Sequence, residues 1–524
     1  MRIERAHVLV GIDTGSLLAG AREVQKKLEE EIKKRGLEEE VKVLETGSLG
    51  ITGRGVVLLV YPEGVYYVNV KPEDVPQIVE EHLLKGRFVK KLMLEPQIAE
   101  ILLKGEVPKK LAKQRRVVLQ NAGVINPDNI EEYIATGGYE ALAKALESSP
   151  AWVISEIDKS GLRGRGGAGF PTGRKWKITA DVKAPQKFIV CNADEGEPGT
   201  FKDRLILEGD PHKVLEGMAI AGYAVGANKG YIYIRGEYDL SIKRINKAIE
   251  DAYRMGLLGD NILETGFSFH VEIKKGAGAY VCGEETALIE SIEGKRGNPR
   301  PKPPYYPGVK GLWGYPTVVN NVETLANVPP IILNGADWFR SMGTKESPGT
   351  KVYTILGHVN EPGLIEVEMG TTLREVIFDF AKGIRDNREF KAALIGGAAG
   401  AFLGKEALDT PLSYEGLREY GGVLGSGAIL VLSETASITD MLKNVIFFFK
   451  HESCGKCVPC RVGVSKLYEK VEKIVHGGGT ERDLKEMLEI SDKMADTALC
   501  ALGQSLILPV SSTIRFFKDE LITA

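Results

Sequence analysis

Short apolar runs alternate with amphipathic segments through the middle of the chain. Residues 187–191 and 231–234 are the continuous apolar runs that buried strands show, and residues 271–273 predict a third strand. Residues 241–255 repeat their apolar positions with the period of a helix, and residues 151–159 are also predicted to be helical. Strands that alternate with helices predict an α/β domain with an open sheet.

The pattern changes twice towards the C-terminal end. Short strands such as 351–356, together with a turn at 396–397, indicate a small β unit over about residues 349–433. After Ser437 the apolar period becomes helical, with a break at 477–479, which predicts a bundle of about four helices. The whole chain is therefore expected to be an α/β multidomain protein.

Composition sets outer limits on the function. The 524 residues are 43% hydrophobic and 27% charged, enough for about three or four domains of ordinary size. The formal net charge of −3 gives no support to nucleic-acid binding, and no apolar stretch reaches the roughly 18 residues of a membrane helix. With few cysteines and no signal peptide, the chain is expected to be cytoplasmic, with any membrane attachment made through partners.

Four of the six cysteines lie near the C-terminal end: Cys454, Cys457, Cys460 and Cys500. A triplet with two residues between neighbours can wrap one face of a cluster, and a distant fourth cysteine can close the cage, so the spacing predicts a cubane iron-sulfur cluster. A zinc site is the alternative, but four-cysteine zinc sites usually pair two C-x2-C knuckles. Two disulfides are disfavoured in a reducing compartment. The expected cluster would move single electrons.

Glycine, at 61 residues, gathers in a few loops, which indicates backbone that approaches a ligand closely. The densest loop, 161–176, contains a G-x-G-x-x-G spacing, but it follows a predicted helix and so is not an ordinary Rossmann turn. Its basic residues suit a phosphate or pyrophosphate and are Arg163, Arg165, Arg174 and Lys175. A flexible solvated loop is the alternative, against which Phe170 and Trp176 argue.

An acidic loop follows the strand predicted at 187–191. It carries Asp194, Glu195 and Glu197, and the carboxyl ends of strands in an open α/β sheet face the ligand. Three carboxylates here could bind a metal, act as acid and base, or accept hydrogen bonds from ribityl, ribose and amide groups. Pro198 and the nearby glycines favour the last reading, because a fixed turn presents acceptors at set angles. A solvated acidic turn fits poorly after so apolar a strand.

A second glycine loop, 276–283, connects the strand at 271–273 to the start of another helix. The first-turn amides of such a helix can hold a phosphate, and acidic residues suit the positive end of its dipole. Further along, the pair Asn320 and Asn321 is, read alone, typical of a turn.

Five segments together resemble a known family: 161–176, 191–204, 276–285, 320–324 and 452–461. They are similar to the NADH-binding flavoprotein subunit of respiratory complex I and to its relatives in soluble NAD-linked hydrogenases and formate dehydrogenases. The resemblance covers about residues 100–524. It implies FMN and NAD(H) stacked in one Rossmann-like domain, and a 4Fe-4S cluster that takes electrons from the flavin one at a time.

The resemblance assigns site residues position by position. Those that match FMN contacts are Gly164, Arg165, Gly166, Lys175, Asn192, Asp194, Glu195, Gly283, Glu284, Asn320, Asn321 and Thr324. Those that match NADH contacts are Phe170, Glu197, Tyr280, Glu285, Lys302 and Tyr305. Glu197 and Glu285 would position the nicotinamide, and Phe170 would stack on adenine. No side chain is expected to be catalytic, because the cofactors carry the chemistry.

The first ninety-odd residues resemble the thioredoxin-like ferredoxin module that is often fused before this subunit. That module normally holds a 2Fe-2S cluster through C-x4-C and C-x3-C, and the matching positions here are Gly11, Ser16, Ser48 and Thr52. With no thiolate among them, we expect a retained fold that binds no cluster and serves as a docking surface.

Four domains are expected: a thioredoxin-like domain without cluster ligands (1–95), an FMN- and NADH-binding α/β domain with a helical lead-in (96–345), a small β-grasp domain (346–435) and a helical bundle that binds the 4Fe-4S cluster (436–524). The predicted function is an NADH:acceptor oxidoreductase subunit of a soluble complex, in one form an electron-bifurcating complex. Its expected partners are a thioredoxin-like 2Fe-2S subunit and an iron-sulfur subunit that leads to a hydrogenase, a formate dehydrogenase or another redox enzyme. Two other hypotheses are the NADH-input subunit of a respiratory complex I and a non-catalytic scaffold, and the intact pocket motifs oppose the scaffold.

Overall fold

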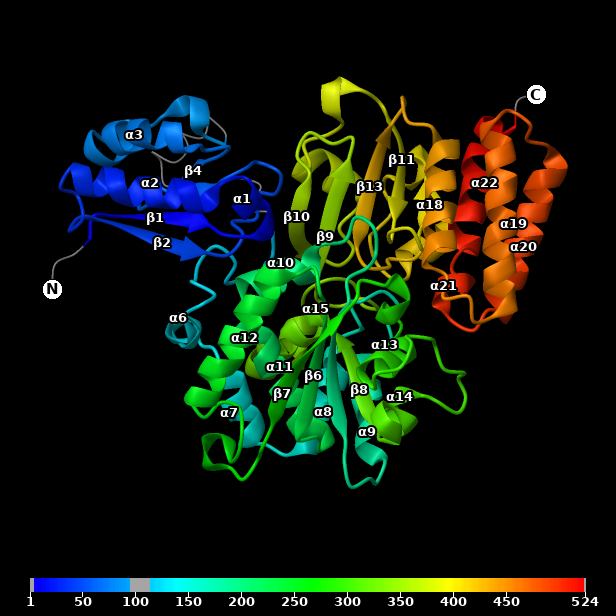
Figure 1. Ribbon diagram of the computed structural model, residues 1–524, viewed down its shortest axis with the longest axis horizontal. Coiled ribbons are helices and arrows are strands. Elements are labelled where there is room, and N and C mark those ends of the chain that lie inside the picture. The colour runs from blue at the N-terminus through cyan, green and yellow to red at the C-terminus, as the bar shows by residue number, and fades with distance from the viewer. Residues whose placement is uncertain (1–3, 95–113, 523–524) are drawn as a thin grey trace.

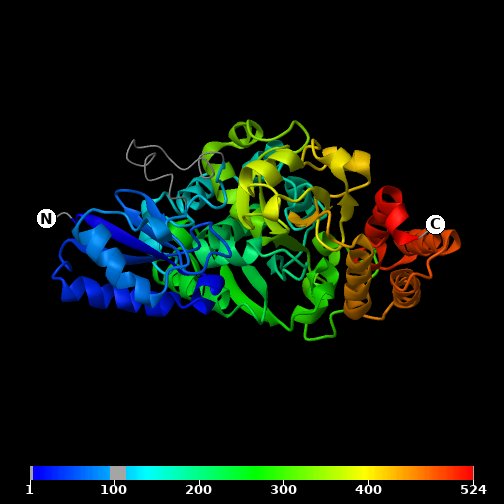
Figure 2. The same cartoon turned by 90° about the horizontal axis from the view of Figure 1, so that it is seen from above.

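The computed structural model of the protein describes residues 4–94 and 114–522; residues 95–113, where the expected helical lead-in begins, lie outside this range. The described residues form three β-sheets and a C-terminal group of helices (Figure 1). The N-terminal sheet and the C-terminal helices lie at opposite ends of the molecule, with the other two sheets between them (Figure 1 and Figure 2). Among the described helices, none is long and apolar enough to cross a bilayer.

The central sheet contains the strands that the apolar runs predict. Its four parallel strands have the order β7-β6-β5-β8, and their bounds are β5 Phe188–Ala193, β6 Lys229–Arg235, β7 His270–Gly276 and β8 Thr317–Asn321. The two predicted helices are present as α8 Pro150–Ser160 and α12 Asp239–Arg254. Because the strands are parallel, all four carboxyl ends meet at one edge of the sheet.

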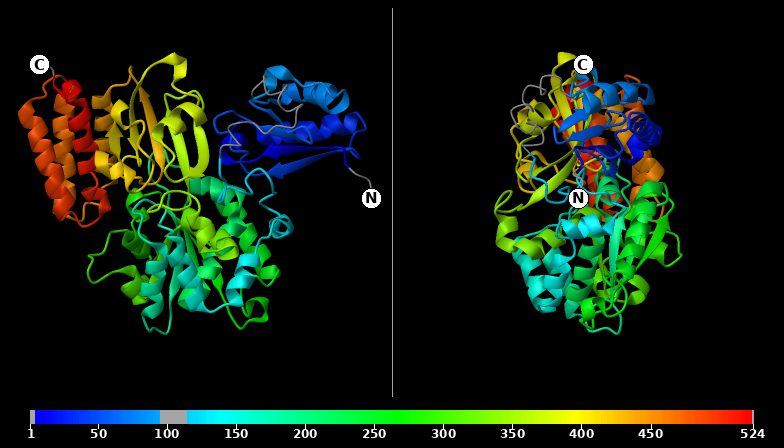
Figure 3. Two further views of the ribbon diagram at one scale, coloured as in Figure 1. Left: turned by 180° about the vertical axis from the view of Figure 1, so that it is seen from behind. Right: turned by 90° about the vertical axis from the view of Figure 1, so that its left-hand side faces the viewer.

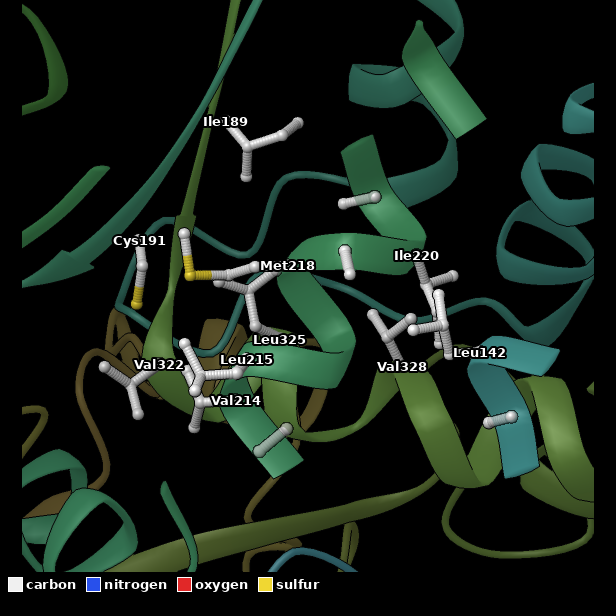
Figure 4. Close-up of a cluster of buried hydrophobic side chains, with 14 of the residues drawn as sticks. Leu142, Ile189, Cys191, Val214, Leu215, Met218, Ile220, Val322, Leu325 and Val328 are labelled. Carbon is white, nitrogen blue, oxygen red and sulfur yellow. The ribbon is translucent and has the colours of Figure 1, made fainter. Parts of the chain in front are cut away.

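An almost wholly buried helix, α11 Pro211–Val225, packs against β5 and fills the middle of this domain. Its start is fixed by Asp210, whose carboxylate accepts from the third helical N–H, and its end by Gly226, which has the left-handed conformation at φ 78° that glycine adopts without cost. Leu215 and Met218 of this helix lie with Cys191 of β5 in one apolar cluster (Figure 4). Cys191 is therefore a core side chain.

The second sheet has five strands in the order β10-β9-β13-β11-β12 and corresponds to the predicted β unit. The bounds are β9 Thr350–Gly357, β10 Gly363–Glu368, β11 Phe390–Ile395, β12 Ala401–Leu403 and β13 Ala428–Ser433. Strands β13 and β9 are parallel, and the other pairs are antiparallel. The predicted turn at 396–397 connects β11 to β12.

The last ninety residues are helical, as predicted. The long helices are α18 Ile438–Glu452, α19 Val458–Val475, α20 Glu481–Thr497 and α22 Ile507–Leu521, and a short helix, α21 Ala501–Gln504, precedes the last of them. The predicted break at 477–479 separates α19 from α20. Strand β12 packs against α22, so the bundle is attached to the second sheet (Figure 1).

The N-terminal sheet has the order β2-β1-β3-β4, with β1 Ala6–Gly11, β2 Val41–Thr46, β3 Leu58–Tyr61 and β4 Val65–Tyr67. This domain rests on α10 Lys202–Gly209 of the central domain. The N–H and the hydroxyl of Thr14 both donate to the buried Glu208 carboxylate, at 3.0 and 2.5 Å. A Cβ atom on Gly47 would lie 2.6 Å from the Cα atom of Gly209, so the two backbones touch. Figure 3 shows the same contact region from behind.

Candidate functional site

The shared edge of the central sheet brings the predicted loops together. Asn192 Nδ2 donates to the carbonyl of Gly283 at 2.9 Å, which joins the acidic loop to the second glycine loop. Thr324 Oγ1 accepts from the backbone N–H of Arg165 at 2.8 Å, which joins the segment after β8 to the first glycine loop. Four segments that are far apart in the sequence therefore line one place, as the parallel strands require.

The first glycine loop lies against the end of β8. A Cβ atom on Gly166 would lie 3.0 Å from the Cβ atom of Asn321, so a larger residue would push the loop away. The guanidinium group of Arg163 stacks over the Tyr414 ring at 3.8 Å, and that of Arg165 is buried and donates to a backbone carbonyl at 2.9 Å. These two side chains are engaged with protein, so backbone N–H groups of the loop are the donors expected to meet a phosphate.

Contrary to what the sequence predicts, the helix that follows the second glycine loop does not offer its first-turn amides to a phosphate. Glu284 is the N-cap of α13 Glu285–Ile292, and its carboxylate accepts from the N–H groups of Thr286 and Ala287, both at 2.9 Å. These two amides are therefore already satisfied by the chain itself and are not free to hold a phosphate. The acidic residues do lie at the positive end of the helix dipole, as predicted.

Two of the three acidic-loop carboxylates have protein partners. Glu195 accepts from the N–H groups of Asp203 and Arg204, at 2.9 and 3.1 Å, and so caps the start of α10. Burial raises the pKa of Glu195 to about 7. Glu197 accepts from the Tyr280 hydroxyl at 2.7 Å and from the Ala399 N–H at 3.2 Å. Glu195 thus holds the loop on the helix beneath it, and Glu197 connects the loop to the second sheet.

Asp194, the third carboxylate, has no such partners. Its Oδ1 and Oδ2 atoms are buried and find no hydrogen-bond donor among the described residues. Burial raises the pKa of Asp194 to about 7. A buried carboxylate without donors is costly, so the position suits a ligand that brings N–H or O–H groups. The ribityl and ring groups of FMN have that chemistry, and on this observation the residues present fit FMN.

The raised pKa of Asp194 gives a pH-dependent prediction for the FMN-free protein. A carboxyl whose pKa rises on folding stabilises the fold below its unfolded pKa, near 4, and this contribution is lost as the pH rises through about 7. We expect thermal denaturation between pH 4.5 and 8 to show wild-type protein losing stability relative to Asp194→Asn as the pH rises. Glu195 and Glu216 have similarly raised pKa values, and the comparison with the variant separates Asp194 from them. Parallel pH curves would contradict the prediction.

A buried group of charges lies beneath the loops and was not predicted from the sequence. The ammonium group of Lys202 lies 2.7 Å from Asp203 and 3.0 Å from Glu323, and Lys351 of β9 lies 2.6 Å from Glu323. Each of these side chains is at most 5% exposed. Burial would raise the pKa of Glu323, but Lys351 and Lys202 hold it below its ordinary value. This charge group fixes the central domain to the second sheet.

The residues expected on the NADH side surround a second group of charges. Lys302 Nζ lies 2.7 Å from Glu284 and 2.8 Å from Glu285, and Lys175 Nζ lies 3.3 Å from Glu285. Burial would raise the pKa of Glu285, but the two lysines lower it, so its carboxylate is ionised at neutral pH. Phe170 is 42% exposed, which leaves its ring accessible for stacking.

The four predicted cysteine ligands come together in one cavity. Cys454 lies in the connection from α18 to α19, Cys457 and Cys460 lie at the start of α19, and Cys500 directly precedes α21. All four line this cavity, whose wall also includes Val281 of the central domain. The fourth ligand therefore arrives from another segment, as the spacing predicts.

The cysteine cavity supplies the donor set of an iron-sulfur cluster. Cys454, Cys457, Cys460 and Cys500 all line it, and a 4Fe-4S cluster is held by four cysteine thiolates. The residues present therefore fit the cluster that the spacing predicts.

Three family models match the chain. The Nuo51 FMN-binding domain matches residues 157–330, the NADH-ubiquinone oxidoreductase-F iron-sulfur binding region matches residues 440–524, and the SLBB domain matches residues 352–379. The first two matches contain the predicted flavin loops and the cysteine cavity. They support the assignments of FMN and the 4Fe-4S cluster as cofactors.

Known proteins are similar over most of the chain. The NADP-reducing hydrogenase subunit HndC of Solidesulfovibrio fructosivorans is 53% identical over 78% of this chain and 83% of its own length. The F subunit of the NADH-quinone oxidoreductase of Aquifex aeolicus is 48% identical over 77% of this chain and 93% of its own length. A crystal structure of an NAD+-reducing NiFe-hydrogenase in the H2-reduced state has a TM-score of 0.69 at 30% identity, over 99% of this chain and 84% of that one.

The matched family regions span the glycine and acidic loops and the cysteine motif of this chain. The chain therefore belongs to the family of NADH-binding FMN and 4Fe-4S oxidoreductase subunits of complex I-like enzymes and NAD-linked hydrogenases.

Proposed function

We propose that this site exchanges a hydride between NAD(H) and FMN. Single electrons would then pass to a partner subunit through the 4Fe-4S cluster that the Cys454–Cys460 loop and Cys500 would hold. One observation carries the proposal: the segment Tyr280–Gly283 touches both halves of the site. Gly283 accepts from Asn192 of the acidic loop, and Val281, two residues earlier, lines the cysteine cavity. The two proposed cofactor positions would thus be separated by one short stretch of backbone, and this separation suits one-electron transfer between them.

The roles of individual residues follow from their surroundings. Asp194 would accept hydrogen bonds from FMN, the first glycine loop would hold its phosphate, and Glu197 and Glu285 would orient the nicotinamide. Bound FMN supplies the conversion of a two-electron input into single-electron steps. The chain's own task is to place the two rings together and to exclude water from them.

The domain boundaries at 95, 345 and 435 and the fold names of the three smaller domains are part of the same proposal. The four-stranded N-terminal sheet supports the thioredoxin-like assignment, and the SLBB match supports the β-grasp assignment. At Gly11, a Cβ atom would lie 3.2 Å from the Leu49 side chain, so apolar packing lies at the position that matches a cluster ligand of the ferredoxin module.

The iron content of the protein tests whether the N-terminal domain binds a 2Fe-2S cluster. We expect about four iron atoms per chain after reconstitution, all in the C-terminal cluster, and none from a 2Fe-2S centre. Iron and sulfide analysis, with EPR spectra of the reduced protein, measures this directly. About six iron atoms per chain, with a second EPR signal, would contradict the absence of an N-terminal cluster.

The soluble complex is favoured as the setting, with a hydrogenase, formate dehydrogenase or another redox enzyme beyond the iron-sulfur partner. The similarity to a hydrogenase protein at 53% identity supports it, while the NADH-quinone oxidoreductase relatives keep respiratory complex I as the second candidate. Electron bifurcation belongs to the first candidate. The proteins that co-purify with the native chain distinguish the two.

Catalysis is tested with reconstituted protein, NADH and an artificial one-electron dye. We expect flavin absorbance that is bleached by NADH, and steady dye reduction. Protein that retains no flavin and reduces no dye would instead support the scaffold hypothesis. NADPH, tested beside NADH, measures nucleotide preference, for which we expect NADH.

A further inference from the structure

Tyr280 lies between the nucleotide side of the site and the cluster side. Its hydroxyl donates to Glu197 Oε2 at 2.7 Å, and its backbone N–H donates to Glu452 Oε2 at 3.0 Å. Its ring meets Phe448 of α18 edge-on, with 5.0 Å between centroids. One residue therefore has contacts in two domains and at both ends of the electron path.

The Glu197 end of this contact is tightly packed. A Cβ atom on Gly196 would lie 3.1 Å from the Tyr280 Cα atom, so the acidic loop rests directly on Tyr280. Burial and the Glu197 charge both raise the pKa of Tyr280 well above its ordinary value, so the hydroxyl remains a donor. Together with the Ala399 N–H, it fixes the direction in which Glu197 points.

The Glu452 end lies at the cluster loop. Glu452 is the last residue of α18, two residues before Cys454, and the next residue, Ser453, lies within hydrogen-bonding distance of Cys460 Sγ at 3.3 Å. Any shift of the Glu452 carboxylate would therefore move the start of the loop that carries three of the four cysteines.

We infer that Glu452 is a positioning residue that acts through Tyr280 on Glu197, so that one hydrogen-bonded connection sets both nucleotide affinity and the surroundings of the cluster. Among the described residues, Tyr280 is the proposed nucleotide residue that donates a hydrogen bond to Glu452. The inference rests on the proposed function, because it takes Glu197 as a nucleotide contact. A charge-assisted hydrogen bond at each end explains why both acceptors are carboxylates.

The test uses full-length protein reconstituted with FMN and iron-sulfur cluster. The variants are Tyr280→Phe, Glu452→Ala and Glu452→Gln, with Glu469→Ala as control, because Glu469 is an exposed carboxylate of the same bundle that pairs with Lys466. The readouts are the NADH dissociation constant from fluorescence titration, the EPR spectrum of the reduced cluster, and KM and kcat with a dye.

Tyr280→Phe is expected to raise the NADH dissociation constant about tenfold and to leave the EPR spectrum unchanged. Glu452→Ala should raise the constant about threefold to tenfold and shift the EPR spectrum, with the change in KM larger than that in kcat. Glu452→Gln keeps an acceptor, so NADH affinity should stay within about twofold of wild type while the spectrum still shifts. The Tyr280→Phe/Glu452→Ala double variant should bind NADH no more weakly than Tyr280→Phe alone.

Unchanged NADH affinity in Glu452→Ala, or an additive effect in the double variant, would overturn the inference. Where Glu452→Ala does not assemble with its cofactors, Glu452→Asp replaces it, because it keeps the charge but shortens the reach, with about a threefold loss of affinity expected. Wild-type protein that binds no flavin and reduces no dye would end the proposed function itself, and this failure is visible before any variant is made.

Discussion

Replacing Cys500 with serine is expected to remove the 4Fe-4S cluster while leaving FMN bound. Of the four cavity cysteines, Cys500 alone lies outside the 454–460 loop, and its loss leaves one iron of the cage without a thiolate ligand. NADH should still bleach the flavin, but electron delivery to a partner or to a cluster-dependent acceptor should fall at least about 100-fold. Stopped-flow flavin reduction, iron analysis and EPR spectra measure the two halves separately.

The matched control is Cys282→Ser. Cys282 is a free cysteine next to the flavin loop and is not among the residues that line the cysteine cavity, so its replacement should leave the iron content unchanged. Equal iron content in wild-type protein and Cys500→Ser would show that Cys500 is not a ligand. Loss of flavin together with iron would show instead that the variant fails to fold.

Replacing Glu323 with glutamine is expected to destabilise the protein by about 3–5 kcal/mol and to weaken flavin retention. The substitution leaves the buried ammonium groups of Lys202 and Lys351 without the carboxylate that they share. Because the charge group lies beneath Asn321 and the acidic loop, its loss should loosen both. Thermal denaturation, followed by flavin fluorescence and by circular dichroism, measures the effect.

Glu469→Gln breaks an exposed pair with Lys466 and should cost less than about 1 kcal/mol. Adding Lys351→Met to Glu323→Gln should recover part of the lost stability, because it removes one of the uncompensated buried charges. If Glu323→Gln melts at the same temperature as Glu469→Gln, the buried charge group does not stabilise the domain junction.

The cysteine motif and the central strands could be predicted because their signals are local. A triplet of cysteines indicates a metal-cluster site, and an unbroken apolar run indicates a buried strand. Each signal lies within about ten residues. The roles of Arg163 and Arg165 could not be predicted in this way. Basic residues in a glycine loop suggest a phosphate, yet the Tyr414 ring and the Pro348 carbonyl that engage them belong to segments more than a hundred residues later.

The charge group of Glu323, Lys202 and Lys351 shows the same limit. A lysine in a sequence is read as a surface residue, and Lys351 stands in a strand of another sheet. Only the packing of the two domains places Lys351 of β9 beside Glu323 of α15 Val322–Ala326, where both side chains are buried. Lys202 and Asp203 directly follow the acidic loop, and this adjacency is the local sequence signal that could have placed them near the site.

Helix α10 also connects the N-terminal domain to the acidic loop of the flavin site. Glu195 of the acidic loop caps one end of this eight-residue helix, and Glu208 and Gly209 at the other end hold Thr14 and Gly47. A helix of this length is a stiff rod of about 12 Å. A protein shortened to begin after the N-terminal domain would leave the far end of that helix unsupported, so laboratory production of the flavin unit should retain the N-terminal domain.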